Sequence, residues 1–475
     1  MSVEAKPAGA PVKFTIKDYK SDLHNDWCPG CIAPDSRIVM ADGASRRIGD
    51  VVAGERVLAH DGEAHTVLQA TSHRHNDTMR RIEISGHGDL VITRDHPMFI
   101  VRRERALELE ATSKAEWVAA GDVRLGDYVA YPQHALVVAG MPAGGPAYGL
   151  RAIVSNDEVV YDGLVHNLEV EGAHSYITVG ATLHNCGDFG ILTGVQMALA
   201  QLNLDPDKVA CFSGIGCSGK TPHYVKAYGF HTLHGRVLPV ATGGRLVNSS
   251  VTVLAMGGDG DGYGIGAGYF VNSGRRNLNF TYIVHNNNVY GLTKGQASPT
   301  LSRGKKTKSM PESAIQDGIN PIAMAVAAGY TFIARAYALE PKYLAGIIAK
   351  AIEHKGSALV DVLQTCPTYN DLYTKEWYEG ADLPEKKSRL YKLEEQGFDG
   401  KVVDVGDQAE IIKKKAAAVA RSYETEPIPI GIYYQAELPT YEDGVNARIP
   451  VLAEKPLVDV DTFHRDVTSL LDAMR

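Results

Sequence analysis

The sequence predicts a doubly wound α/β protein that is interrupted by an inserted all-β domain. Residues 31–185 contain short β-rich stretches between Gly and Asp turns, whereas after Gly187 apolar strands alternate with helical patterns. If residues 31–185 are left out, Trp27-Cys28-Pro29-Gly30 runs directly into Cys186-Gly187-Asp188, which restores a continuous Cys-x-x-Cys loop. We therefore expect an N-terminal host segment (1–30), an insert (31–185) and a C-terminal host segment (186–475).

The insert is expected to consist of short strands. Its β-branched or alternating stretches are bounded by turn dipeptides such as Asp42-Gly43 and Asp61-Gly62. The expected strands are Arg37–Met40, Glu55–Ala59, His65–Ala70, Met79–Ser85 and Leu90–Thr93.

The C-terminal host segment shows a different pattern, in which buried apolar strands alternate with helices. This alternation predicts a mainly parallel sheet covered by helices. The expected strands are Val209–Phe212, Ser250–Met256, Phe280–Val284 and Ala358–Gln364, and the expected helices are Gly190–Leu202, Ala323–Ala328 and Pro341–His354. Cys211 lies in the first of these strands, so we expect it in the core.

The bulk composition excludes several classes of protein. The net charge is −8 without a basic block, which argues against nucleic acid as a partner. No run of about 18 apolar residues is present to span a membrane, and the N-terminus lacks the apolar core of a signal peptide. Six cysteines in 475 residues do not make a disulfide scaffold. We expect a cytoplasmic protein.

Reactive side chains stand at both ends of the insert. It begins with the thiol of Cys31 and ends with the cyclisable amide of Asn185, and a second thiol, Cys186, follows. These are the parts of a self-excising segment, because a thiol can take over an acyl group from an amide. With Thr93-Arg94-Asp95-His96 inside the insert and His184-Asn185 at its end, residues 31–185 resemble a mini-intein, which implies a Hint-type fold.

The resemblance implies a role for each reactive residue. Cys31 attacks the carbonyl of Gly30, Cys186 then accepts the acyl group, and cyclisation of Asn185 releases the insert. Thr93 and His96 polarise or protonate the scissile amide, and His174 and His184 donate or accept protons. The insert departs from the family at Asn167, where such inteins often carry Asp, so the proton transfer there is slower or uses another base.

In the host, polar residues follow two neighbouring strands. Gly258-Asp259-Gly260 comes after one strand and Asn286-Asn287-Asn288 after the next. A carboxylate and an amide can ligate one hard cation, and glycine-rich backbone can cradle a diphosphate. The pattern resembles the diphosphate site of thiamine-diphosphate enzymes, which implies that Asp259, Asn287 and the Val289 carbonyl hold Mg²⁺. The rival dinucleotide motif Gly-x-Gly-x-x-Gly fails at every register.

Three further motifs resemble the β subunit of 2-oxoacid:ferredoxin oxidoreductases. They are Gly214-Ile-Gly-Cys-Ser-Gly-Lys220, His231-Thr-Leu-His-Gly-Arg236 and Tyr290-Gly-Leu-Thr-Lys294. The family pattern implies a 4Fe–4S cluster held by Cys28, Cys186, Cys217 and Cys366. It also implies that Lys220 meets the substrate carboxylate. The residues implied to contact thiamine diphosphate are Ile215, Gly216, Cys217, Ser218, His234, Gly258, Asp259, Asn287, Val289, Gly291 and Leu292.

The resemblance implies oxidative decarboxylation of a 2-oxoacid to acyl-CoA and CO₂, with electrons passed to ferredoxin. The substrate expected first is 2-oxoglutarate and second pyruvate. An α subunit would supply the pyrimidine-side domain in a heterodimer or an α₂β₂ assembly, with coenzyme A as a substrate. Two alternatives stay open: a thiamine-diphosphate decarboxylase or synthase without a cluster, and a non-enzymatic metal or disulfide module with an inactive insert.

Overall fold

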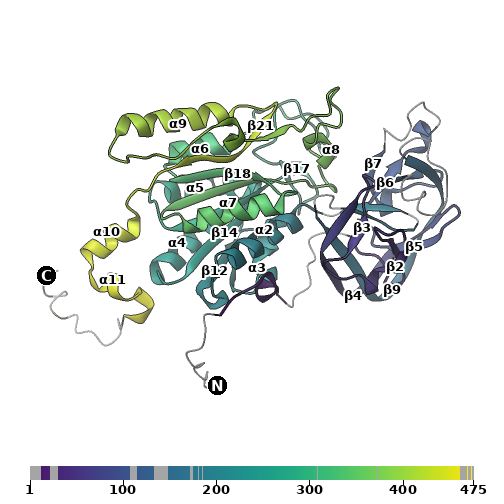
Figure 1. Cartoon of the computed structure of the whole chain (residues 1–475), viewed down its shortest axis with the longest axis horizontal. Helices are drawn as coiled ribbons and strands as arrows, with labels where there is room; N and C mark the ends of the chain where they lie inside the picture. The colour runs from purple at the N-terminus through teal and green to yellow at the C-terminus, as the bar shows by residue number, and fades with distance from the viewer. Residues whose placement is uncertain are drawn as a thin grey trace, which may run out of the picture.

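The computed structural model of the chain describes residues 12–21, 30–106, 115–132, 148–171, 175–179, 181–184, 186–307, 309–370 and 372–460, with Thr468 and Asp472. Figure 1 shows two bodies, a helix-covered sheet on the left and a body of strands on the right. The strand body is formed by residues between Cys31 and His184, and the sheet with its helices by residues after Cys186. The predicted fold class, an α/β host with an inserted all-β domain, is therefore confirmed.

The host sheet has eight strands in the order β13-β12-β14-β15-β19-β18-β21-β20. The neighbours from β13 to β18 are parallel, β21 runs antiparallel to β18, and β20 is parallel to β21. The strands are β12 (Val209–Ser213), β13 (Tyr228–His231), β14 (Thr252–Gly258), β15 (Phe280–Asn286), β18 (Phe332–Tyr337), β19 (Ser357–Leu363), β20 (Leu390–Lys392) and β21 (Ile428–Gln435).

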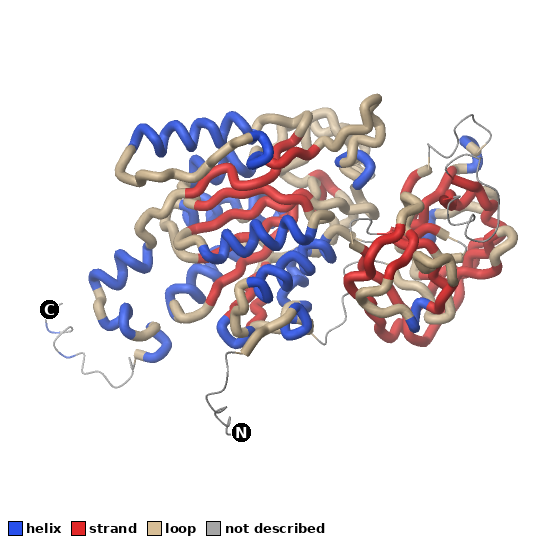
Figure 2. Tube along the Cα trace, viewed as in Figure 1, coloured by secondary structure: helices blue, strands red, loops and turns tan. Residues whose placement is uncertain are grey.

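Helices pack on both faces of this sheet, as Figure 2 shows in blue. One core lies beneath α2 (Asp188–Gln201) and α7 (Pro341–Glu353). The other lies beneath α4 (Val237–Val247), α5 (Ala267–Gly274), α6 (Pro321–Ala328) and α9 (Gln408–Ser422). Shorter helices are α3 (Thr221–Tyr224), α8 (Lys375–Tyr378), α10 (Tyr441–Arg448) and α11 (Val451–Glu454), and a small hairpin is formed by β16 (Val289–Tyr290) and β17 (Gln296–Ala297). Two buried cores on opposite faces make the fold doubly wound.

The insert surrounds its own apolar core. Its strands are β1 (Arg37–Val39), β2 (Ser45–Arg47), β3 (Arg56–Leu58), β4 (Ala64–Ile84), β5 (Gly88–Ile92), β6 (Pro97–Val101), β7 (Glu116–Ala119), β8 (Tyr128–Pro132), β9 (Tyr148–Val170), β10 (Ser175–Ile177) and β11 (Thr182–His184). All pairings among them are antiparallel. The long strands β4 and β9 pair along most of their length and form the longest strand pair of the insert.

The expected elements are present with small shifts of their ends. Helix α2 begins at Asp188, two residues before the expected start, and Cys211 is fully buried in β12 as expected. One expectation was wrong: His65–Ala70 and Met79–Ser85 are not two strands but parts of the single strand β4. The connecting residues 71–78 are all polar, so the sequence there lacks the alternation of apolar and polar side chains that marks a strand, although their burial alternates between half-buried and exposed up to Asn76.

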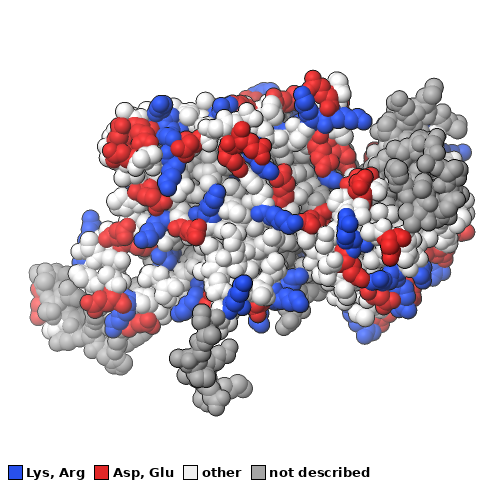
Figure 3. Space-filling view, in the orientation of Figure 1, with Lys and Arg blue, Asp and Glu red and all other residues white. Residues whose placement is uncertain are grey.

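The surface of the described residues carries mixed charge. Figure 3 shows acidic and basic side chains interspersed over the face in view, in keeping with the modest net charge. Within the described ranges, no helix has the length and apolar character needed to cross a bilayer.

Candidate functional site

A cavity of about 140 Å³ lies at the carboxyl edge of the host sheet, where β12, β14 and β15 end side by side. Ligand sites of open parallel sheets lie at this edge. Lys220 ends the short helix Ser218–Lys220 beside the cavity and is not part of its lining. All eleven residues predicted to contact thiamine diphosphate line the cavity: Ile215, Gly216, Cys217, Ser218, His234, Gly258, Asp259, Asn287, Val289, Gly291 and Leu292.

Asp259 is the buried carboxylate of this cavity. It accepts hydrogen bonds from the backbone N–H groups of Gly260 and Asn288, both at 3.0 Å, and from the hydroxyls of Ser298 and Thr300. Burial raises the pKa of Asp259 to about 6 in spite of these donors. A carboxylate so desolvated gains much from a nearby cation, which is what the predicted Mg²⁺ would supply.

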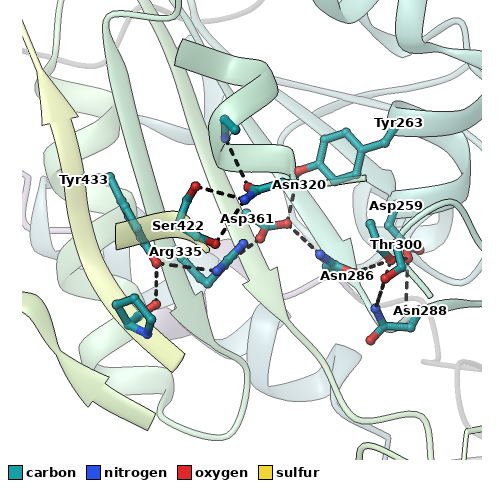
Figure 4. Close-up of polar contacts among 12 residues, drawn as sticks. Asp259, Tyr263, Asn286, Asn288, Thr300, Asn320, Arg335, Asp361, Ser422 and Tyr433 are labelled. Atoms are coloured by element: carbon teal, nitrogen blue, oxygen red, sulfur yellow. Dashed lines mark hydrogen bonds and ion pairs between the residues drawn. The ribbon is translucent and has the colours of Figure 1, made fainter. Parts of the chain in front are cut away.

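The loop after β15 is held by a buried polar network that begins deep in the sheet (Figure 4). Arg335 donates to Asp361 at 2.9 Å, and Asp361 accepts from the side chain of Asn286 at 3.0 Å. Asn286 Oδ1 faces the hydroxyl of Thr300 at 2.9 Å, and Thr300 in turn contacts Asp259. The network fixes the start of the Asn286–Asn288 loop relative to Asp259. Asn288, with φ of +63°, then turns the chain.

Asn287 is oriented by its own neighbours. Its Oδ1 accepts from the N–H of Val289 at 3.1 Å, and its carbonyl accepts from Asn370 Nδ2 at 2.7 Å. Asn287 and Val289 thus line the cavity together with Asp259, as the predicted Mg²⁺ site requires.

Two further residues of the cavity lining, Ser218 and Asp261, carry polar atoms that lack partners in the described part of the chain. The Ser218 hydroxyl is buried without a hydrogen bond, and Oδ2 of Asp261 is also unsatisfied, among the described residues. Asp261 Oδ1 accepts from the N–H groups of Ile215 and Gly235 and lies 3.0 Å from His234 Nδ1. Buried polar groups without partners are rare. The Ser218 hydroxyl can donate to a phosphate oxygen of a bound diphosphate, whereas the Asp261 oxygen accepts and needs an N–H or O–H donor or a cation.

Sequence reasoning missed several cavity residues, among them Asp261 and the pair formed by His285 and Asp188. His285 Nδ1 lies 2.5 Å from Asp188 Oδ1, and both side chains are buried. His285 lines the cavity, and its Nε2 lacks a hydrogen-bond partner among the described residues. Asp188 opens α2 while His285 lies near the end of β15, so only the fold brings them together. An apolar strand followed by His just before an Asn-Asn pair was the one available signal.

Three of the four predicted cluster cysteines lie near this pair. Cys186 Sγ donates to Asp188 Oδ2 at 3.4 Å. A side chain built on Gly291 would place its Cβ 3.6 Å from Cys217 Sγ and 3.9 Å from Cys366 Sγ, so these thiols face the same glycine. Burial raises the pKa of the Cys366 thiol to about 11. The described residues hold no group of three or more His, Cys, Asp or Glu side chains arranged for a metal ion, and Cys28 lies outside them.

In the insert, Thr93 and His96 flank the peptide bond between Gly30 and Cys31. The Cys31 N–H donates to Thr93 Oγ1 at 2.9 Å, and the Thr93 N–H donates to the Cys31 carbonyl at 2.9 Å. The ring of His96 is packed against Gly30, where an added Cβ would lie 1.6 Å from His96 Nδ1. Burial lowers the pKa of His96 to about 3, so the ring is neutral.

The Cys31 thiol is buried, and burial raises its pKa to about 12. Its Sγ lies 3.9 Å from His73 Nδ1, a neighbour that the sequence did not single out because His73 stands in the polar middle of β4. Asn167 Oδ1 accepts from the Tyr176 hydroxyl and from the Leu168 N–H, both at 2.9 Å. Of the predicted splicing residues, His174 and Asn185 lie outside the described residues, as does the side chain of His184.

Comparison with known proteins identifies the host. A model of the thiamine pyrophosphate enzyme C-terminal TPP-binding domain matches residues 214–362, and a model of the C-terminal part of the pyruvate ferredoxin oxidoreductase β subunit matches residues 366–448. The 2-oxoacid:ferredoxin oxidoreductase subunit β of Saccharolobus solfataricus is 52% identical over 275 residues, covering 57% of this chain and 87% of that protein. The chain belongs to the family of 2-oxoacid:ferredoxin oxidoreductase β subunits.

Two solved structures are similar to parts of this β subunit. The 2-oxoglutarate:ferredoxin oxidoreductase from Magnetococcus marinus, with 2-oxoglutarate, coenzyme A and succinyl-CoA bound, aligns at a TM-score of 0.50 and 33% identity, over 61% of this chain and 90% of that one. A DnaB intein from Synechocystis sp. PCC 6803 aligns at a TM-score of 0.25 and 17% identity, over 33% of this chain and 98% of the intein.

Membership of the family confirms the predicted enzyme class and the thiamine-diphosphate-binding α/β domain of the β subunit. It sets aside the alternative of a non-enzymatic metal or disulfide module. The individual ligand and catalytic roles stay predictions, which the geometry of the cavity supports.

Proposed function

We propose that the chain excises residues 31–185 and that the joined β subunit performs oxidative decarboxylation of 2-oxoglutarate, with thiamine diphosphate, Mg²⁺ and a 4Fe–4S cluster. The observation that carries the oxidoreductase proposal is the cavity in which Asp259, Asn287 and Val289 meet beside unsatisfied polar groups. The observation that carries the excision proposal is the enclosure of the Gly30–Cys31 bond by Thr93 and His96.

In the host, Asp259, the Asn287 side chain and the Val289 carbonyl would hold Mg²⁺, and Ser218 and the glycine-rich turn after β14 would meet the diphosphate. Thiamine diphosphate, when bound, supplies the nucleophilic carbon and the electron sink that decarboxylation of a 2-oxoacid needs. The protein contributes orientation: Arg335 and Asp361 anchor Asn286, and Asp188 holds the His285 ring toward the cavity.

The cluster would be ligated by Cys28, Cys186, Cys217 and Cys366. Joining Gly30 to Cys186 places Cys28 three positions before Cys186, which gives the Cys-x-x-Cys spacing typical of thiolate-bound clusters. Cys217 and Cys366 already lie on the same side of Gly291, where both sulfurs would be within 4 Å of an added Cβ. The cluster would accept electrons from the decarboxylation and pass them to ferredoxin.

The remaining partners follow from the family. An α subunit supplies the pyrimidine-side domain, in a heterodimer or an α₂β₂ assembly, and coenzyme A accepts the acyl group in the cytoplasm. Lys220, next to the cavity, would meet the substrate carboxylate. The preference for 2-oxoglutarate rests on the similar enzyme from Magnetococcus marinus, which was solved with 2-oxoglutarate and succinyl-CoA bound.

In the insert, the Cys31 thiol adds to the carbonyl of Gly30 and displaces its own amide nitrogen, which takes up the proton, so that a thioester replaces the amide. Thr93 and the neutral His96 contact this bond, and His73 is near the thiol. Cys186 then takes the acyl group from Cys31. Cyclisation of Asn185 cleaves the bond to Cys186, and an S-to-N shift leaves a peptide bond between Gly30 and Cys186.

Two variants test the excision. Cys31→Ala removes the first nucleophile, and Asn185→Ala removes the cyclising amide but leaves thioester formation intact. We expect the intact mass of the wild-type product to equal that of the chain without residues 31–185, rather than the full 51.3 kDa. A spliced product from Asn185→Ala would contradict the mechanism.

Iron analysis tests the cluster and separates the proposal from a cluster-free decarboxylase. The spliced β subunit, purified with its α subunit, should contain about four iron atoms per β subunit. The unspliced Asn185→Ala chain should contain fewer, because Cys28 and Cys186 are then separated by the insert. Iron-free spliced enzyme that still decarboxylates a 2-oxoacid would favour the alternative.

A further inference from the structure

The insert and the host meet through polar side chains as well as through the chain itself. Glu376 of α8 lies against the insert, with Oε1 3.5 Å from His60 Nε2 and 3.4 Å from Trp117 Nε1. The adjacent Lys375 lies 3.9 Å from Asp61, and its side chain is only 5% exposed. Figure 1 shows α8 on the side of the host that faces the strands of the insert.

His60 is a buried part of the insert. Its ring makes edge contacts with the rings of Trp117 and Phe99, at centroid distances of 5.8 and 6.2 Å. Burial is the main cause that lowers the pKa of His60 to about 3, and the positive charge of Lys375 lowers it further. The ring is therefore neutral, with one nitrogen that donates and one that accepts.

The hydrogen bonds assign the tautomer. Ser175 Oγ accepts from the His60 backbone N–H at 3.1 Å, so its own proton is available to His60 Nδ1 at 2.7 Å. With Nδ1 as the acceptor, the ring proton lies on Nε2 and points to Glu376. Trp117 Nε1–H is a second donor to the same carboxylate oxygen. One host side chain thus satisfies two donors of the insert.

Ser175 connects this contact to the C-terminal end of the insert. It is the first residue of β10, directly after His174 in the sequence. In the β10–β11 ladder Ser175 pairs with His184, and Asn185 follows. A contact that fixes Ser175 therefore fixes the ladder that leads into the cleavage site.

We propose that the host positions the C-terminal junction of its own insert, through Glu376 and His60 as positioning residues. The inference rests on the proposed excision. The carboxylate of Glu376 holds the His60 ring, the ring holds Ser175, and Ser175 holds the β10–β11 ladder, whose strand β11 ends at His184, directly before Asn185 in the sequence. Excision is then coupled to a host in which α8 is already folded.

Pulse-chase translation of the full chain tests this coupling. Glu376→Ala removes the acceptor of two donors and should slow release of the insert about tenfold. Glu376→Gln keeps an acceptor oxygen in place and should stay near the wild-type rate. Glu385→Ala is the matched control, because Glu385 is 69% exposed and its ion pair with Lys387 lies within the host.

A second measurement separates positioning from a general loss of structure. Thiol-induced cleavage between Gly30 and Cys31 reports thioester formation at the other junction, and it should be unchanged in Glu376→Ala. Trp117→Phe keeps an aromatic ring and removes one donor, so its effect should be less than additive with Glu376→Ala.

The outcomes distinguish the two proposals. If the wild-type chain does not release its insert, the proposed excision is wrong and the coupling with it. If the wild type and Glu376→Ala release the insert at the same rate, or if both junctions slow equally in that variant, the coupling alone is wrong.

Discussion

At the scale of single residues, Gly30 matters because it has no Cβ atom beside the peptide bond that precedes Cys31. The absence of a Cβ at Gly30 lets the neutral His96 ring pack against the scissile bond. Sequence reasoning predicted Thr93 and His96 at this bond from their resemblance to a family motif, and in the structure both side chains contact it. It did not find His73, whose approach to Cys31 depends on the course of β4. It could not find the pairing of Asp188 with His285 either, since the two are 97 positions apart.

Gly30→Ala should suppress thioester formation. Its Cβ would lie 1.6 Å from His96 Nδ1, so the ring must leave the scissile bond. We expect thiol-induced cleavage at this bond to fall about tenfold or more, in line with the loss of a positioned proton-transfer group. Gly243→Ala is the control, because a Cβ at Gly243 meets no atom within 4 Å. Cleavage at the wild-type rate in Gly30→Ala would contradict the role of His96.

Thr300→Val should weaken the cofactor site without touching the ligands themselves. The Thr300 hydroxyl contacts Asp259 and accepts from Asn288 Nδ2 at 3.0 Å. Loss of such an outer contact typically lowers metal affinity roughly 10- to 100-fold. Calorimetric titration of the spliced β subunit with thiamine diphosphate and Mg²⁺ measures this. Thr252→Val, at the opposite end of β14, should bind as the wild type does.

At the scale of elements, the host strands β12, β14, β15 and β19 were predictable because their apolar runs are continuous. The parallel strands β13 and β18 were missed, and the polar network in the sheet was not predictable. Arg335 and Asp361 stand in the middle of apolar strands and look like ordinary surface charges in the sequence. Only the pairing of β18 with β19, in which these two residues are register partners, brings the charges together in the core. The middle of β4 is a strand in the structure although its sequence is polar throughout and lacks the alternation of apolar and polar residues typical of a strand.

Asp361→Ala should destabilise the host strongly. It leaves the Arg335 guanidinium buried without its carboxylate and releases Asn286 and Tyr263, which both contact Asp361. Removing one member of a buried ion pair costs about 3–5 kcal/mol of unfolding free energy. Asp317→Ala breaks the exposed pair with Arg303 and should cost at most about 1 kcal/mol. Urea unfolding, applied to both variants of the spliced β subunit, measures the difference.

At the scale of the whole molecule, the insert carries an acid sensitivity of its own. His60 and His96 are buried and neutral, with pKa values of about 3 in the folded chain against 6.5 for an exposed histidine. The unfolded chain therefore binds protons below about pH 6.5 that the folded insert does not accept until about pH 3. The unfolding free energy of the insert is therefore unaffected by these histidines above about pH 6.5, and it decreases as the pH falls from 6.5 toward 3.

Each histidine should lower the unfolding free energy of the insert by up to about 1.4 kcal/mol per pH unit within this window. Urea unfolding of the splice-blocked Asn185→Ala chain at neutral and mildly acidic pH measures the loss. His96→Gln has no proton to gain in this range, so its stability should fall less steeply with acid. An equal slope in that variant would show that His96 is already protonated in the folded chain.

The position of the insert has a consequence for its inheritance. In the proposed excision Cys186 is the acceptor at one splice junction. It also lies beside Asp188 at the cavity, and a Cβ on the next residue, Gly187, would lie 2.9 Å from the Gln364 side chain. A gene deletion that removed one codon too many would lose this cysteine, and one that removed a codon too few would add a residue at a crowded turn. On the proposed excision and cluster ligation, we expect only a deletion of residues 31–185, no more and no fewer, to restore the enzyme, so that most partial losses of the insert would be harmful to the host.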